Sequence, residues 1–283
     1  METLYIYDMS NSKLQLKVLA TNWGFEGTLR DYISRVKNEG YDGIEIWWPM
    51  DERELTELAG LLNENKLEAG FLCGAQDINY TEHFNFFKKM VEAAATNRLI
   101  KPLYINCHSG RDYFSYDQNK TFIDFTIALS KKTGIKILHE THRSRIMYSA
   151  PAGRNYFDKI PDLRITFDVS HWCNVSESLL ANQGETMKIA LERTDHIHAR
   201  IGHPEGPQVN DPRAPEWKEA LDSHLAWWDK IVEIKKASGD TLTMLTEFGP
   251  ADYMPTEPYS RKPLADQWAI NVYMKDLLRK RYS

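Results

Sequence analysis

The chain alternates short apolar runs, rich in β-forming residues, with longer segments of helical periodicity, almost to its end. The eight runs are Leu16–Gly24, Gly43–Trp48, Leu67–Gly74, Tyr104–Gly110, Lys136–Arg143, Arg164–Trp172, Asp195–Gly202 and Thr241–Pro250. Between the first two runs, Leu29, Ile33 and Val36 share one helical face and Gly40 provides a stop. Repeated strand–helix units require a parallel sheet that is covered by helices.

The number of units selects the kind of parallel sheet. Eight units in 283 residues average about 35 residues each, the size of a unit in a (β/α)8 barrel. The main alternative is an open, doubly wound sheet, but no GxGxxG or GxxxxGKS/T loop follows any run. We therefore predict an α/β fold with a single (β/α)8 TIM barrel domain over residues 1–283.

The composition argues against several classes of partner. The formal net charge is −5, so nothing attracts the whole chain to nucleic acid or to an anionic membrane. No apolar run approaches the roughly 18 residues of a membrane-spanning helix. The N-terminus lacks the features of a secretory signal, and Cys73, Cys107 and Cys173 suit buried thiols in a reducing compartment. We expect a cytoplasmic protein without nucleic-acid or membrane partners; homo-oligomer formation and earlier loss of a signal stay open.

Polar residues gather where the later runs end. The fifth run ends around HETHR, the sixth contains FDVSHW, the seventh reads DHIHARIG and the eighth contains LTEFGP. Two long loops, Gly202 to Pro215 and ADYMPTEPYSRKP, follow the last two runs. Barrel enzymes carry their chemistry at the carboxyl ends of the strands, where side chains from several strands meet. We therefore expect an active site on this face.

Four residues at these ends offer ligand atoms for a metal ion: Glu140, Asp168, His198 and Glu247. A carboxylate at the end of a buried strand is costly unless it is paired or metal-bound; for Asp168 a salt bridge or helix cap is the alternative. Period-two alternation places His196, His198 and Arg200 on one side of a strand, which suggests His198 as ligand and His196 as its support. Such a mixed set suits one divalent ion (Mn²⁺, Zn²⁺, Mg²⁺ or Co²⁺) rather than a structural thiolate zinc site.

Other residues at the same ends are candidates for substrate binding: Trp47, His108, Arg143, His171 and Arg200. Arg200 either steadies a substrate group or pairs with Asp168, and the sequence favours neither reading. Trp47, like Trp23 and Trp48, either stacks on a sugar ring or packs against a helix. We expect Glu45 to face inward, and its role is open.

The order of these motifs resembles the xylose isomerase-like barrel superfamily, which includes sugar isomerases and epimerases, inosose dehydratases and endonuclease IV. The shared order is Glu at the end of the fifth strand, D-x-x-H at the sixth, H-x-H at the seventh and Glu at the eighth, and the likeness extends from Val18 to about Leu278. In the ketose 3-epimerase branch the two glutamates bind metal and also move protons.

This resemblance implies roles for individual residues. Glu140 and Glu247 would be both ligands and catalytic acid–base groups, Asp168 and His198 would complete the metal site, and His171 would hold a substrate oxygen. The implied function is a metal-dependent isomerase or epimerase that acts on a small sugar or polyol through an enediolate. A lyase or dehydratase acting on keto-sugars or inososes, and a noncatalytic sugar-binding barrel, are the alternatives.

Two positions depart from the family pattern. The epimerases carry an arginine six residues after the metal histidine, where this chain has Pro204, so that Arg200 or Arg213 would have to substitute. The endonuclease branch needs a D-x-H, whereas this chain has Asp211-Pro212-Arg213. We therefore expect one metal ion and no cleavage of DNA.

Overall fold

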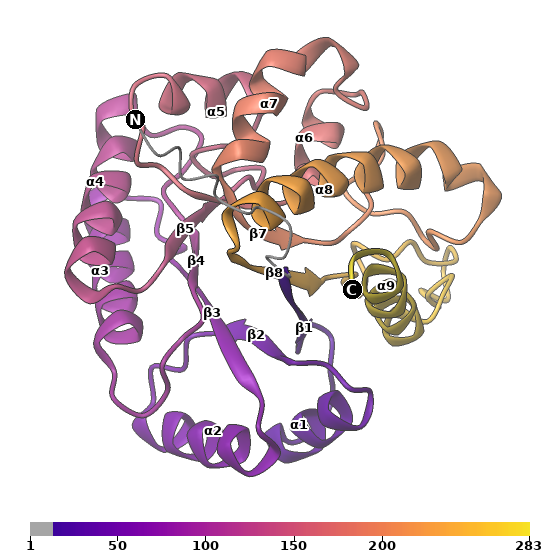
Figure 1. Ribbon diagram of the computed structural model, residues 1–283, viewed down its shortest axis with the longest axis horizontal. Helices are drawn as coiled ribbons and strands as arrows, with labels where there is room; N and C mark the ends of the chain where they lie inside the picture. The colour runs from indigo at the N-terminus through magenta and orange to yellow at the C-terminus, as the bar shows by residue number, and fades with distance from the viewer. Residues whose placement is uncertain (1–13) are drawn as a thin grey trace, which may run out of the picture.

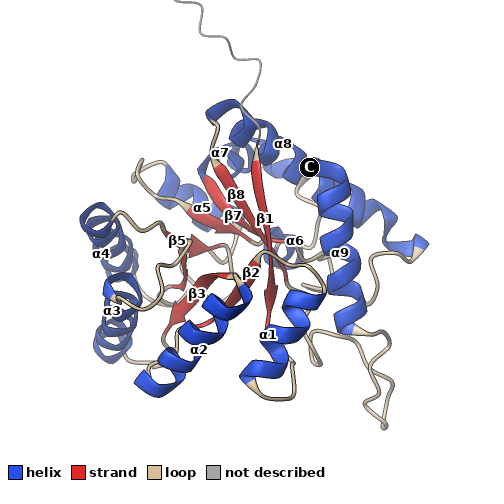
Figure 2. Cartoon of the chain, turned by 60° about the horizontal axis from the view of Figure 1, so that its bottom comes forward, coloured by secondary structure: helices blue, strands red, loops and turns tan. Residues whose placement is uncertain are grey.

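The computed structural model describes residues 14–283, in which eight parallel strands close into a barrel in chain order. Helices surround these strands (Figure 2). The strands are β1 (Gln15–Thr21), β2 (Gly43–Trp47), β3 (Glu68–Gly74), β4 (Ile105–His108), β5 (Ile137–Glu140), β6 (Ile165–Phe167), β7 (Thr194–His198) and β8 (Thr241–Thr246). Each overlaps a run that the sequence predicts as a strand, so the predicted (β/α)8 barrel is confirmed. The N-terminal segment, in which the sequence shows no secretory signal, begins outside the described residues.

The outer layer consists of helices that follow the strands in turn (Figure 1). They are α1 (Leu29–Asn38), α2 (Glu52–Asn65), α3 (Tyr80–Thr96), α4 (Tyr116–Thr133), α5 (Ala150–Phe157), α6 (Val169–Val175), α7 (Gly184–Arg193), α8 (Lys218–Ser238) and α9 (Gln267–Tyr282), with 3-10 turns η1 (Ala181–Gln183) and η2 (Pro215–Trp217). Of the predicted helical face, Ile33 and Val36 are buried and Leu29 is partly buried, and Gly40 follows α1 with φ +72°. Within residues 14–283, no helix combines the length and apolar character needed to cross a bilayer.

The inside of the barrel has its own apolar layer. Leu19, Tyr104, Leu138 and Leu245 form a buried cluster separate from the larger core between strands and helices. They come from opposite sides of the barrel, around β1 and β8 and around β4 and β5, so they can meet only in its interior. Two residues further along these strands, the inward positions are Asn106, Glu140 and Glu247. Apolar packing therefore closes the barrel beneath the polar carboxyl ends.

Most strands end earlier than the sequence predicts, most clearly the sixth, whereas β3 ends at Gly74 as predicted. β6 stops at Phe167, and α6 begins at Val169. The Asp168 carboxylate caps this helix by accepting the Ser170 N–H at 3.1 Å, an interaction that favours helix initiation. His171 therefore lies in the first turn of α6 and not on a strand, which corrects the predicted extent of that run.

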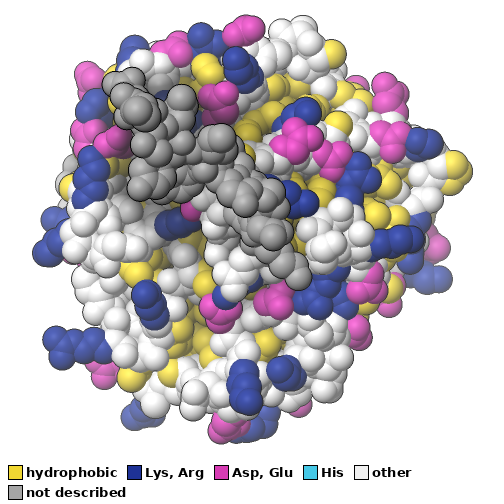
Figure 3. All heavy atoms as spheres, viewed as in Figure 1, with side chains coloured by type: hydrophobic (Ala, Val, Ile, Leu, Met, Phe, Trp, Pro, Cys, Tyr) yellow, Lys and Arg dark blue, Asp and Glu magenta, His cyan; other side chains and the backbone are white. Residues whose placement is uncertain are grey.

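The charged side chains are mixed on the surface. On the face shown in Figure 3, Lys and Arg side chains are interspersed with Asp and Glu side chains. Many charged residues pair with an oppositely charged residue of the same helix, as Lys120 does with Asp124 and Arg154 with Asp158. Opposite charges thus lie close together on the surface of a chain whose net charge is small and negative.

Candidate active site

A cavity of about 320 Å³ opens at the carboxyl ends of the strands. Its wall comes from the ends of the strands and the loops just after them: Thr21, Asn22, Trp23, Glu45, Ile46, Trp47, Leu72, Gln76, His108, Glu140, His142, Arg145, Arg200, Glu247 and Tyr253. Tyr253 belongs to the long loop after β8. This is the face on which the sequence predicts the active site, and the volume is at the small end of the range for small-molecule pockets.

The four predicted metal ligands meet around one imidazole nitrogen. Nδ1 of His198 lies 2.9 Å from Glu247 Oε2, 3.6 Å from Glu140 Oε1 and 4.0 Å from Asp168 Oδ2. Glu140 and His198 end β5 and β7, whereas Asp168 and Glu247 directly follow β6 and β8. Glu140, Asp168 and His198 are buried, and the Glu247 side chain is 12% exposed.

The donor set fits a divalent cation. Two of its atoms, His198 Nδ1 and Glu247 Oε2, are buried and make no hydrogen bond of good geometry within residues 14–283, although they lie 2.9 Å apart and Arg200 Nη1 lies 3.1 Å from Glu247 Oε2. Leaving a buried polar atom without a partner is costly, and a cation between these atoms would satisfy both. Asp168, His198 and Glu247 bring ligand atoms within 4.8 Å of one another. Carboxylate oxygens with one imidazole nitrogen suit Mn²⁺, Zn²⁺, Mg²⁺ or Co²⁺.

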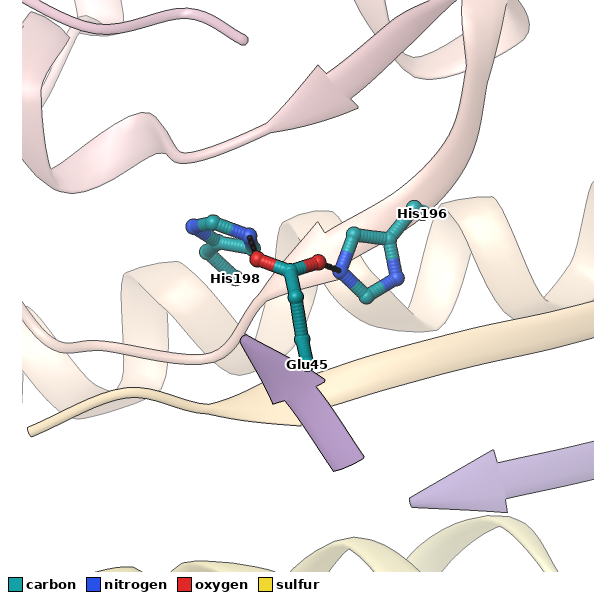
Figure 4. A group of neighbouring side chains, drawn as sticks. All are labelled: Glu45, His196 and His198. Atoms are coloured by element: carbon teal, nitrogen blue, oxygen red, sulfur yellow. Dashed lines mark hydrogen bonds and ion pairs between the residues drawn. The ribbon is translucent and has the colours of Figure 1, made fainter. Parts of the chain in front are cut away.

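Glu45 on β2 orients His198. His198 Nε2 lies 3.1 Å from one Glu45 oxygen, and His196 Nε2 lies 3.3 Å from the other; Figure 4 shows the carboxylate between the two rings. A histidine that gives its second ring N–H to a carboxylate presents its other nitrogen to a metal. Burial opposes ionisation of Glu45, but His198 and His196 outweigh it and hold its pKa well below the usual value. Glu45 therefore holds Nε2 of His198 and leaves Nδ1 facing the other predicted ligands.

A tyrosine completes this support. Tyr104 donates its hydroxyl to Glu45 Oε2 at 2.7 Å, and its ring stacks on His196 with 4.0 Å between centroids. It reaches Glu45 past Gly70, where an added Cβ would lie 2.4 Å from Tyr104 Cζ. The sequence predicts His196 as a supporting group and leaves Glu45 open; Tyr104 was missed because its partner lies on another strand.

Glu140 is anchored through one of its two oxygens. Asn106 donates to Glu140 Oε2 at 2.7 Å, and His108 Nε2 lies 2.9 Å from the same oxygen. Oε1 is left on the side of His198. Burial opposes ionisation of Glu140, but His108 and His198 lower its pKa well below the usual value. Asn106 was also missed, although period-two alternation back from His108 places it inside the barrel.

Arg200 lies against the ligand cluster. Its guanidinium pairs with Asp168 Oδ2, lies 3.1 Å from Glu247 Oε2 and donates to His171 Nε2 at 2.8 Å. Of the two readings that the sequence leaves open, the structure shows the pair with Asp168, while the side chain also lines the cavity. Burial raises the pKa of Asp168 to about 6 against the opposing effect of Arg200, and a bound cation would act in the opposite direction.

The predicted substrate-binding residues fall into two groups. Trp47 and His108 line the cavity, and their rings meet edge to face with 5.5 Å between centroids. His171 is fully buried behind Arg200 and outside the wall; burial, His142 and Arg200 lower its pKa, which favours a neutral imidazole. Trp48, in contrast to Trp47, is buried against Phe71 in the outer core.

Arg143 is also outside the cavity wall. Its Nη1 lies 3.3 Å from Asn174 Oδ1, and its guanidinium lies 5.1 Å from the centre of the Tyr253 ring. Arg145, two residues further on, lines the cavity instead. The sequence missed Arg145, together with His142 and Gln76, because all three follow the ends of their strands, where side-chain alternation no longer applies.

Comparison with solved structures finds sugar epimerases and a dehydratase with this fold. The chain is similar to the 3-keto-D-glucoside 4-epimerase YcjR from E. coli, with a TM-score of 0.62 and 14% identity over 94% of this chain and 100% of that one. It is similar to D-psicose 3-epimerase in the presence of D-fructose, with a TM-score of 0.61 and 13% identity over 93% and 98% of the two chains. For the probable 3-DHS dehydratase AsbF from Bacillus anthracis the values are 0.60 and 15% over 94% and 100%.

A family model decides the relationship, since identities this low show the fold alone. A search of curated proteins found no match. The model described as a xylose isomerase-like TIM barrel, however, matches residues 33–253. This range covers most of the sequence and includes Glu140, Asp168, His198 and Glu247. The chain therefore belongs to the xylose isomerase-like TIM barrel family.

Proposed function

We propose that the protein is a metal-dependent epimerase or isomerase of a small sugar. The observation that carries this proposal is the pair of carboxylates, Glu140 and Glu247, which line one cavity and both approach Nδ1 of His198. Moving a proton beside a carbonyl requires such acid–base groups next to the bound carbon. The similar structures of YcjR and D-psicose 3-epimerase, named as epimerases, support this choice.

A divalent ion held by Glu140, Asp168, His198 and Glu247 would supply Lewis acidity, which polarises the substrate carbonyl and acidifies the neighbouring C–H. One glutamate removes this proton to give an enediolate, and the other glutamate, or the first again, returns it to the opposite face or to the adjacent carbon. His108 lies 2.9 Å from Glu140 Oε2 and steadies that carboxylate. Arg200, 3.1 Å from Glu247, adds positive charge where the enediolate develops negative charge.

A second candidate function starts with the same step. An enediolate that carries a leaving group on the next carbon expels it, so the same residues suit a lyase or dehydratase. The similarity to AsbF, named as a probable 3-DHS dehydratase, favours keeping this candidate. Loss of water changes the mass of the product, so mass spectrometry of the product separates the two functions.

Proton exchange with solvent tests the step that the two functions share. We expect Mn²⁺-loaded wild-type protein in D₂O to place deuterium beside the carbonyl of ketohexoses such as D-fructose and D-psicose, as NMR would show. Glu140→Gln and Glu247→Gln should lower the rate by about 100-fold or more, because glutamine offers an oxygen to the metal but accepts no proton.

Two controls make the exchange experiment decisive. Glu64→Gln, an exposed glutamate paired with Arg30, should exchange like the wild type. His198→Ala should lose the metal in elemental analysis. Full exchange in both glutamine variants would refute the acid–base assignment, and the absence of exchange in the wild type with every ketose tested would count against the proposed function.

A further inference from the structure

We propose that the sugar substrate carries a negatively charged group, a carboxylate or a phosphate, and that Arg145 binds it. This inference rests on the proposed function, because it adds a second contact to the same substrate. It is carried by an arginine that the metal centre and the acid–base chemistry leave unused.

Arg145 is placed in the wall of the active-site cavity. It lies in the loop between β5 and α5, five residues after Glu140, and is 4% exposed. It shares the cavity wall with Glu140 and Glu247. A ligand that reaches the two carboxylates therefore lies in the same enclosed space as this guanidinium.

Most of the hydrogen-bonding capacity of Arg145 is unused. Nη1 donates to the main-chain oxygen of Ala75 at 3.0 Å, and Nη2 makes a long contact of 3.4 Å with Gln76 Oε1. Nε is buried and has no partner. Because a guanidinium has five N–H donors, two bonds to neutral acceptors leave the majority without an acceptor among residues 14–283. Tying down the loop after β3 accounts for both of these bonds, because Ala75 and Gln76 both follow that strand, but it leaves Nε and the remaining N–H groups without a role.

The charge of Arg145 is also uncompensated at close range. No carboxylate of residues 14–283 lies within 4.0 Å of its nitrogens; Glu140 and Asp112 act on it only from farther away. The neighbouring charge is another cation, Arg111, whose Nη2 donates to Gln76 and whose Nε likewise has no partner. Burial and Arg111 lower the pKa of Arg145 to about 10.

An anion in the cavity would relieve this imbalance. Burying a cation without a counter-charge is unfavourable, and the fork of a guanidinium matches carboxylate and phosphate oxygens. The cavity of about 320 Å³ suits a ligand of monosaccharide size. A sugar with its reacting carbons at Glu140 and Glu247 would present its charged end to Arg145.

Three ketohexoses that differ only at C6 test the charge requirement: D-fructose, D-fructuronate and D-fructose 6-phosphate. Their affinities for Mn²⁺-loaded protein can be measured by titration calorimetry. We expect at least one of the two anions to bind at least about tenfold more tightly than fructose, by roughly 1.4 kcal/mol. Preference for fructuronate would identify the group as a carboxylate, and preference for fructose 6-phosphate would identify it as a phosphate.

Variants assign the preference to Arg145. Arg145→Gln should reduce affinity for the preferred anion to that for fructose, and Arg145→Lys should retain part of the preference. Arg30→Gln, an exposed arginine on α1, is the matched control and should behave as wild type. If Arg145→Gln does not fold, the Arg145→Lys affinities decide.

The possible failures are distinct. If wild type binds neither anion more tightly than fructose, or if the Arg145 variants keep the full preference, the inference about Arg145 is wrong. Deuterium exchange on fructose in those same samples would show that the proposed function survives. Conversely, a charge preference that depends on Arg145 in a protein without exchange would support Arg145 and refute the acid–base function.

Discussion

Nη1 of Arg200 lies 3.1 Å from Oε2 of Glu247, while the same guanidinium pairs with Asp168. A fixed cation thus contacts two of the residues proposed to hold a metal ion. In the metal-free protein it partly neutralises the buried carboxylates. When a metal ion binds, Arg200 repels that ion and competes with it for the same carboxylate oxygens.

Replacement of Arg200 should therefore have opposite effects on metal binding and on the metal-free fold. We expect Arg200→Met to bind Mn²⁺ several-fold more tightly, as calorimetric titration would show. The metal-free variant should lose about 3–5 kcal/mol of stability, which lowers the unfolding temperature by roughly 10 °C or more. Unchanged stability combined with unchanged Mn²⁺ affinity would contradict this role.

Glu45 should control metal affinity without touching the metal. Glu45→Gln removes the charge that accepts the N–H of His198 Nε2 at 3.1 Å. Loss of a group in this position typically weakens metal binding by about 10–100-fold, and we expect that range for Mn²⁺. Glu64→Gln on α2 should leave the affinity unchanged. Equal Mn²⁺ affinity in both variants would show that Glu45 does not orient the ligand.

Asp195, at the opposite end of β7 from His198, should contribute to stability rather than catalysis. Arg164 contacts it at 2.8 and 2.9 Å, and Lys235, itself buried, pairs with the same carboxylate. Burial opposes ionisation of Asp195, but Arg164 and Lys235 outweigh it and lower its pKa to about 2. We expect Asp195→Asn to lower the free energy of unfolding at pH 7 by about 3 kcal/mol, as urea denaturation would measure.

The same carboxylate predicts part of the acid denaturation. Because its pKa is lower in the folded protein than the unfolded value of about 3.9, its contribution is complete above roughly pH 5 and is lost as the pH falls toward 2. The wild type should lose stability across this window, and Asp195→Asn should lose about 2–3 kcal/mol less. Parallel stability curves for the two proteins would rule out this assignment.

Arg213 should prevent endonuclease activity. Its Nε donates to Asp211 Oδ1 at 2.8 Å, and a second nitrogen lies 2.6 Å from Oδ2. The aspartate is therefore neutralised within its own loop and is not available for an additional metal ion. We expect no cleavage of abasic-site duplex DNA with Mg²⁺, Mn²⁺ or Zn²⁺ at physiological salt. Metal-dependent cleavage above the level of an Asp168→Ala, His198→Ala protein would overturn this expectation.

Some features of the site follow from local sequence once a barrel is recognised. Glu140 and His198 end strands whose periodicity is plain in the chain, and barrel closure brings those ends together. The fold and the convergence of the four proposed ligands could therefore be predicted without knowledge of tertiary contacts. For Asp168 the structure shows both alternatives that the sequence leaves open, because its carboxylate caps α6 and pairs with Arg200.

Other features depend on contacts between distant segments. Glu45 and His198 are 153 residues apart, and no local pattern relates them. Past the end of a strand the alternation of side chains is lost, so the loop conformation after β5 decides that Arg145, and not Arg143, lines the cavity. Periodicity reports which face of a regular element a residue occupies, and so it predicted the barrel and the meeting point of the ligands. The charge environment of that point depends on which side chains from other strands and loops fill the enclosed space, and only packing in three dimensions sets this.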